Sequence, residues 1–229
     1  MTRKHDTMRT PVLAGALLWV ATASGATWYA APPPCSTVEA SCGTSYANAC
    51  CTIQHAINRS NNGDTVLVKP GTYTQLIDFF RNQVGKGIIV KKDTAFAGEA
   101  ILQWTSTGAS IVEFNCATNV CGPNHGTLEG FTITGLSGIS GFSGTGISVQ
   151  SASPTILNNT VRANGGTGIY VSAGSPTIRG NTISANGNAA AVAGGGINLI
   201  SSSAVIEDNL ICRNIAADGG GFTPWTPST

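Results

Sequence analysis

The chain has 229 residues, a formal net charge of +1 and only 10% charged residues. Proteins that grip phosphate backbones need dense Lys and Arg clusters, so this composition argues against a nucleic-acid partner. The 29 glycines, with few Met and aromatic residues, suit many tight turns better than a helical bundle. The length allows one domain.

Residues 1–26 have the organisation of a secretory signal peptide. Basic residues precede an apolar run over 12–23, and small residues follow, with rival cleavage sites after Ala23 and Ala26. The run is shorter than the roughly 20 residues of a membrane span, and no later stretch supplies a span. The alternative is a buried N-terminal helix. We expect a secreted or cell-surface protein, and cleavage after Ala26 leaves a net charge of −1.

The seven cysteines of an exported chain predict disulfides. Cys116 and Cys121 flank a loop that one bridge could close, and Cys212 is left over. A zinc site that adds His125 to the loop cysteines is the alternative, but three ligands on one loop are a weak set. We expect no metal and no cofactor. Four cysteines crowd residues 27–62 and allow two bridges of undetermined connectivity: Cys35, Cys42, Cys50 and Cys51.

Residues 27–62 also contain a predicted helix. In TIQHAI (52–57), Ile53, Ala56 and Ile57 share one helical face. A short amphipathic helix here could cover the open N-terminal end of a stacked structure.

Short apolar segments follow, and they read as strands of early coils. They are GIIVKK (87–92), AILQW (100–104), SIVEF (110–114) and LEGFTI (128–133), in which Phe131 takes a position that Asn holds later.

An internal repeat determines the predicted fold. Residues 144–165 align with 166–187, and the latter align with 195–214 after one insertion in a stretch of small residues. Each unit has three apolar alternations of period two, which indicate strands, separated by Gly, Asn, Ser and Pro turns. The units lack the Leu signature of leucine-rich repeats and are shorter than propeller blades.

Units of this kind bury their inner faces only by stacking. The sequence therefore predicts an all-β, right-handed single-stranded parallel β-helix over residues 63–229, with three strands per coil and 22–28 residues per coil. About six coils fit between Asp64 and Gly221.

Two asparagine series recur at the corners of the repeat. Asn tolerates left-handed backbone, and stacked Asn amides can hydrogen-bond along the axis. We expect ladders, with an Asn-lined ligand row as the alternative. Arg179 and Glu207 share a register and predict a surface ion pair, and Asp208 falls at a turn. The series are Asn159, Asn181, Asn209 and Asn164, Asn186, Asn214.

At the C-terminus, Phe222 takes the inward Ile position of a new unit, which TPWTPST soon ends. An exposed last coil offers an open sheet edge. We therefore expect a C-terminally incomplete β-helix.

The segment TIQHAINRSNNGDTVLVKPGTY, followed by SPTI, NNTV and NGGTGI coils, resembles the pectin lyase-like family of right-handed parallel β-helix proteins, in particular its secreted bacterial members. The resemblance implies the fold. It does not imply one function, because that family contains lyases, hydrolases, esterases, epimerases and adhesins.

The catalytic sets of that family are incomplete here. The sequence has no Asp-Asp pair and no Gly-His-Gly, and the esterase-like GTYTQ ends in Gln75. The regular coils offer few carboxylates, namely Glu207 and Asp208 with Asp218 just after them, too few for a calcium cage. His55 and His125 lie near no recognisable nucleophile motif. The catalytic residues stay unknown.

An outward row on the first strand of each repeat is the candidate site: Ser148, Gln150, Tyr170 and Asn198. Short polar groups around one aromatic ring suit an extracellular or cell-surface polysaccharide; an ordinary solvated face is the alternative. Two functional classes follow. One is a non-catalytic glycan-binding, adhesin-like or structural module. The other is a truncated lyase, hydrolase or epimerase whose acidic site lies in further coils.

Overall fold

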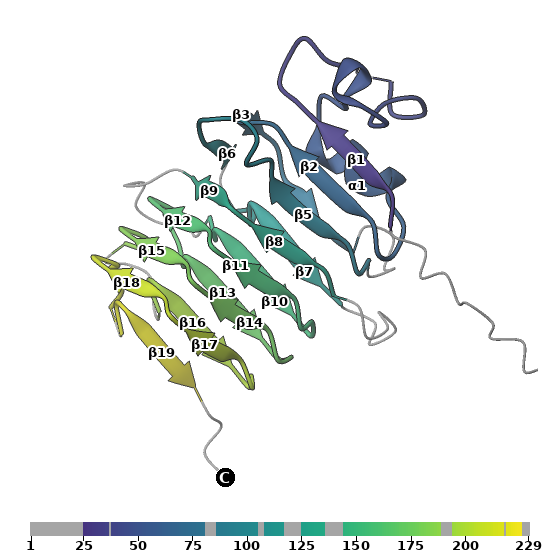
Figure 1. Cartoon of the computed structure of the whole chain (residues 1–229). Helices are drawn as coiled ribbons and strands as arrows, with labels where there is room; N and C mark the ends of the chain where they lie inside the picture. The colour runs from purple at the N-terminus through teal and green to yellow at the C-terminus, as the bar shows by residue number, and fades with distance from the viewer. Residues whose placement is uncertain are drawn as a thin grey trace, which may run out of the picture.

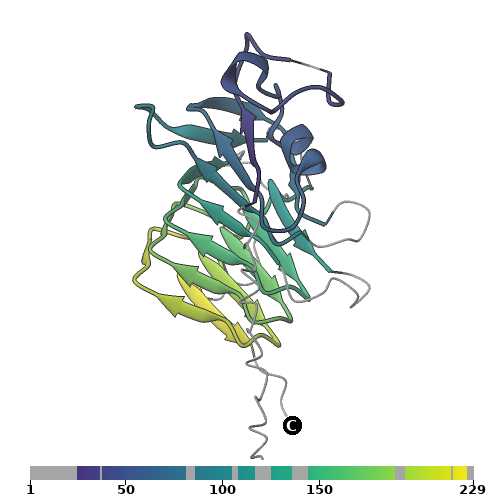
Figure 2. The same ribbon diagram turned by 45° about the vertical axis from the view of Figure 1, so that its right-hand side comes forward.

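The computed structural model describes residues 25–36, 38–80, 86–104, 108–116, 125–135, 144–188, 194–217 and 219–225. In these ranges the chain winds through three parallel sheets, with three strands in each of six coils (Figures 1 and 2). This is the parallel β-helix that the repeat predicts.

Sheet A has the order β1-β2-β5-β8-β11-β14-β17. Its strands are β1 (Thr27–Ala30), β2 (Thr65–Val68), β5 (Ile89–Lys92), β8 (Thr127–Glu129), β11 (Thr155–Leu157), β14 (Thr177–Arg179) and β17 (Val205–Glu207). Sequence analysis did not identify β1, which pairs in parallel with β2 and extends the sheet beyond the first complete coil.

Sheets B and C complete the coils. Sheet B contains β3 (Gly71–Thr74), β6 (Ala100–Gln103), β9 (Phe131–Thr134), β12 (Thr160–Arg162), β15 (Thr182–Ser184) and β18 (Leu210–Cys212). Sheet C contains β4 (Ile77–Asp78), β7 (Val112–Asn115), β10 (Ile147–Gln150), β13 (Ile169–Ser172), β16 (Ile197–Ile200) and β19 (Phe222–Trp225).

Rows of inward side chains form the core. Ile147, Ile169 and Ile197 are register partners on sheet C and are fully buried, as the repeat alignment predicts. Phe222 follows Ile197 in the same register. Nearer the N-terminus the rows become aromatic, and the rings of Phe79 and Phe114 stack with centroids 4.2 Å apart.

The two asparagine series form buried ladders. The amide of Asn159 donates to Asn181 Oδ1 at 3.2 Å, and that of Asn181 donates to Asn209 Oδ1 at 2.9 Å. Asn164, Asn186 and Asn214 repeat the pattern at 2.8 and 3.0 Å. Each linking Oδ1 also accepts the backbone N–H of the preceding ladder residue. The predicted ladders are confirmed.

The backbone geometry corrects one part of that prediction. The left-handed residues are the ones just before the ladder positions. At the first corner they are Asn158, Gly180 and Asp208, with φ of 54°, 65° and 54°. The left-handed corner residue turns the chain and directs the next Asn inward. There the Asn side-chain amide hydrogen-bonds backbone groups that the bend leaves without a strand partner.

A short helix, α1 (Ile53–Arg59), packs against β1, β2 and β4 at the N-terminal end of the stack (Figure 1). Thr52 caps its start by accepting from the N–H of His55 at 3.1 Å. The ammonium of Lys86 donates to three carbonyls at its end, those of Ile57, Asn58 and Ser60. Satisfying these carbonyls fixes the helix on the coils.

The cysteines follow the predicted scheme in part. Disulfides join Cys35 to Cys51 and Cys42 to Cys50, beside a 3-10 helix, η1 (Tyr46–Asn48). Cys116 is disulfide-bonded, but Cys121 lies outside the described residues, so the predicted loop bridge stays a prediction. Cys212 is a free thiol. The predicted signal peptide also lies outside the described residues, apart from its last two positions.

Candidate functional site

The predicted outward row lies on sheet C. Ser148, Tyr170 and Asn198 are successive register partners on β10, β13 and β16. Gln150 belongs to a second row, which continues through Ser172 and Ile200. Stacking therefore brings the four predicted residues onto one face.

The exposure of this face differs from the expectation at one position. Ser148 points outward, yet only 4% of its surface is exposed. Gln150 is exposed and its amide lies 3.4 Å from Ser148 Oγ, while Tyr170 and Asn198 are half-buried. Gly194 lies so close to Asn198 that a Cβ on it would fall 2.5 Å from the Asn198 Cβ. The accessible part of the row therefore centres on Gln150 and Tyr170.

Two carboxylates extend the row in the earlier coils. Glu113 on β7 is the register partner of Ser148, and Asp78 on β4 is the partner of Glu113. Sequence analysis did not assign them to a site. The signal was present, because Val112-Glu113-Phe114 repeats the inward-outward-inward pattern of Ile147-Ser148-Val149.

The two carboxylates interact. Burial raises the pKa of Glu113 above its usual value, and the negative charge of Asp78 raises it further. Asp78 is held in place, because its Oδ1 accepts the N–H of Phe80 at 2.8 Å. The pair therefore combines a fixed carboxylate with one that holds its proton more tightly than a free side chain.

An unsatisfied amide oxygen lies beside the pair. Asn115 is two residues after Glu113 on the same face of β7 and is the register partner of Gln150. Its Oδ1 is buried and accepts no hydrogen bond from the described part of the chain. A buried acceptor without a donor costs about 1–3 kcal/mol, so a ligand hydroxyl that reached it would recover that energy.

The other charged residues singled out from the sequence form surface pairs. Arg179 Nε lies 4.0 Å from Glu207 and 3.3 Å from Asp208, and more than half of each side chain is exposed. The predicted ion pair is confirmed, and the left-handed turn at Asp208 adds a second partner. Exposed pairs of this kind contribute little.

Neither of the two described histidines is a member of the outward row. His55, on α1, contacts Glu39 at 3.4 Å, and the ring of His125 packs near Phe80. Among the described residues, no three His, Cys, Asp or Glu side chains gather as metal ligands would. No described helix is long and apolar enough to cross a membrane.

No curated protein matches the chain. A family model described as "Protein of unknown function (DUF1565)" matches residues 39–223. That range begins between Cys35 and Cys42, ends within β19 and includes the whole candidate surface. The chain belongs to the DUF1565 family.

Proposed function

We propose that the protein is an extracellular glycan-binding module whose binding surface is the outward face of sheet C. The row from Asp78 through Glu113, Ser148 and Tyr170 to Asn198 carries the proposal. It presents carboxylates and amides for sugar hydroxyls and one aromatic ring for the apolar face of a sugar. The disulfides, the predicted signal peptide and the resemblance to pectin lyase-like proteins favour an extracellular polysaccharide.

A glycan array followed by calorimetry on the best polysaccharide tests the proposal. Tyr170→Ala is expected to weaken binding severalfold, because stacking on one ring contributes about 1 kcal/mol. Stability should stay nearly unchanged, since the side chain points outward. Leu157→Ala is the matched control, an outward apolar residue on sheet A. Absence of any glycan ligand, or binding indifferent to Tyr170→Ala, would refute the proposal.

A second candidate is hydrolysis of a glycosidic bond by Asp78 and Glu113. Retaining glycosidases place two carboxyl groups about 5–5.5 Å apart, and neighbouring strands lie about 4.8 Å apart. The raised pKa of Glu113 suits a general acid. New reducing ends from the array ligands, lost in Glu113→Gln, would favour this candidate over simple binding. For polygalacturonate and alginate we expect no new unsaturated ends.

A further inference from the structure

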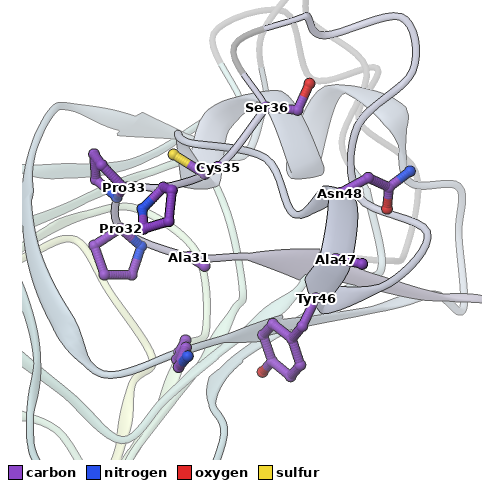
Figure 3. A pocket seen from close by; sticks show the side chains of 10 residues that line it. Ala31, Pro32, Pro33, Cys35, Ser36, Tyr46, Ala47 and Asn48 are labelled. Carbon is purple, nitrogen blue, oxygen red and sulfur yellow. The ribbon is translucent and has the colours of Figure 1, made fainter.

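A hollow lies on the N-terminal cap, and none of the residues that line it belongs to sheet C. It encloses about 640 Å³ between the segment Ala31–Ser36 and helix η1 (Figure 3). Pro32, Pro33 and the ring of Tyr46 give it apolar walls, and Lys69 also lines it. Its volume falls in the usual range for small-molecule sites.

The walls of this cap hollow are fixed before any ligand arrives. The Cys35–Cys51 disulfide ties one wall to the start of α1, and the Cys42–Cys50 disulfide ties down the loop that leads to η1. Backbone hydrogen bonds join the walls directly, with Ser36 N–H donating to the Ala49 carbonyl at 2.8 Å. A pre-formed site avoids the entropy cost of ordering on binding.

Tyr46 is locked in one orientation. Its hydroxyl donates to Asp93 Oδ2 at 2.6 Å, and its ring packs edge-on against Tyr29 and Phe96, with centroids 4.7 and 5.2 Å away. Burial and the Asp93 carboxylate raise its pKa above the ordinary value for tyrosine. The result is a rigid aromatic wall.

The hollow has a positive charge balance. Lys69 is the charged residue among those that line it. Its Nζ lies 4.9 Å from the centre of the Phe96 ring, a cation–π contact. Among the described residues it forms no ion pair with a carboxylate. Asp93, the carboxylate that Tyr46 contacts, accepts hydrogen bonds from the Tyr46 hydroxyl and from the N–H of Ala95. The side-chain amide of Asn48 donates hydrogen bonds within its own loop, to the Ser41 carbonyl and to Thr44 Oγ1.

We propose that the cap hollow binds a sugar ring carrying an anionic substituent, either a carboxylate or a sulfate ester. The ring would stack on the Tyr46 and proline walls, and the anion would pair with Lys69. The site is separate from sheet C and does not depend on it.

Three monosaccharides that share one ring test this proposal: glucose, glucuronate and glucose 6-sulfate. Their affinities for the full chain are measured by NMR titration. At least one anionic sugar is expected to bind roughly fivefold or more tightly than glucose, as one charge-assisted contact allows. The stronger of the two anionic sugars identifies the substituent.

Variants assign the effect to this hollow. Lys69→Met should abolish the preference for the anion, and Lys69→Arg should retain it. Tyr46→Leu should weaken the binding of all three sugars. If that change disturbs the cap, Tyr46→Phe, which keeps the ring, is the second variant and should retain the binding. Lys91→Met, on a neighbouring surface hollow, is the control and should change nothing. Equal affinity for the three sugars, no measurable binding, or an anion preference that survives Lys69→Met would overturn the proposal.

Discussion

The side-chain amide of Gln54 binds both backbone polar groups of Asp78. Gln54 Oε1 accepts the N–H of Asp78 at 2.8 Å, and its Nε2 donates to the carbonyl at 3.0 Å. Asp78 belongs to β4, the first strand of sheet C, whose outer edge would otherwise be unpaired. The helix residue therefore takes the place of a neighbouring strand and covers an edge that would invite aggregation.

Replacing Gln54 with Leu should lower the free energy of unfolding by about 1–3 kcal/mol, because two backbone groups lose their partners under a buried side chain. Gln103→Leu, an outward change on sheet B, should alter stability by less than about 0.5 kcal/mol. Urea unfolding followed by circular dichroism compares the two. Equal effects would show that the Gln54 contacts contribute nothing specific.

The asparagine ladder predicts a gradient of stability effects. Asn181 is buried and bonded on both sides, whereas Asn209 ends its ladder among the described residues and is partly exposed. Asn181→Ala should cost about 2–4 kcal/mol, since it strands buried partners above and below. Asn209→Ala should cost less, because water can reach the groups it leaves. Thermal unfolding compares the two variants. A larger loss of stability in Asn209→Ala than in Asn181→Ala would contradict the ladder's role.

Glu113 predicts a pH dependence of stability. Its folded pKa is raised, so the folded state binds the proton more tightly than the unfolded chain does. Its contribution is most favourable below the ordinary pKa of glutamate and is lost as pH rises through the folded pKa. Glu113→Gln should therefore stabilise the protein at pH 7 relative to wild type and leave it little changed at pH 4. A variant less stable at pH 7 would disprove the assignment.

Asp64 predicts the opposite dependence. Burial opposes its charge, but the N–H groups of Asn61 and Ala26 and the indole of Trp28 outweigh burial and lower its pKa. Its stabilisation is present above the unfolded pKa and is lost as pH falls through the folded pKa. Acid should therefore release β1, which Trp28 fluorescence can follow. Asp64→Asn should show that spectral change at neutral pH.

The free and bonded cysteines can be distinguished chemically. In unreduced protein Cys212 should react with an alkylating reagent, and the four N-terminal cysteines and Cys116 should not. Peptide mapping should recover the Cys35–Cys51 and Cys42–Cys50 pairs and should test the predicted link from Cys116 to Cys121. Alkylation of Cys116 would contradict its disulfide.

The last described coil exposes apolar side chains at the end of the stack, with Val205, Leu210 and Ile215 46%, 59% and 55% exposed. The edges of β17 and β18 lie beside them. We expect the chain to self-associate through this end. In sedimentation, Leu210→Lys should shift the population toward monomer, whereas Val38→Lys, at an exposed site on the cap, should not. A wild-type chain that stays monomeric would refute the expectation.

The sequence alone predicted the coils, because inward and outward positions repeat within each strand and only one stacking register buries the inward rows of Ile and Val. It also predicted the ladders, since Asn159 and Asn181 recur at fixed places in units of equal length. The tertiary structure decided which residues face one another in neighbouring coils of unequal length. Asp78 and Glu113 meet because β4 and β7 stack, although the segments between them follow no repeat. The ring of Tyr46 is likewise fixed by Tyr29, Asp93 and Phe96, and contacts between such distant segments are encoded by no local pattern.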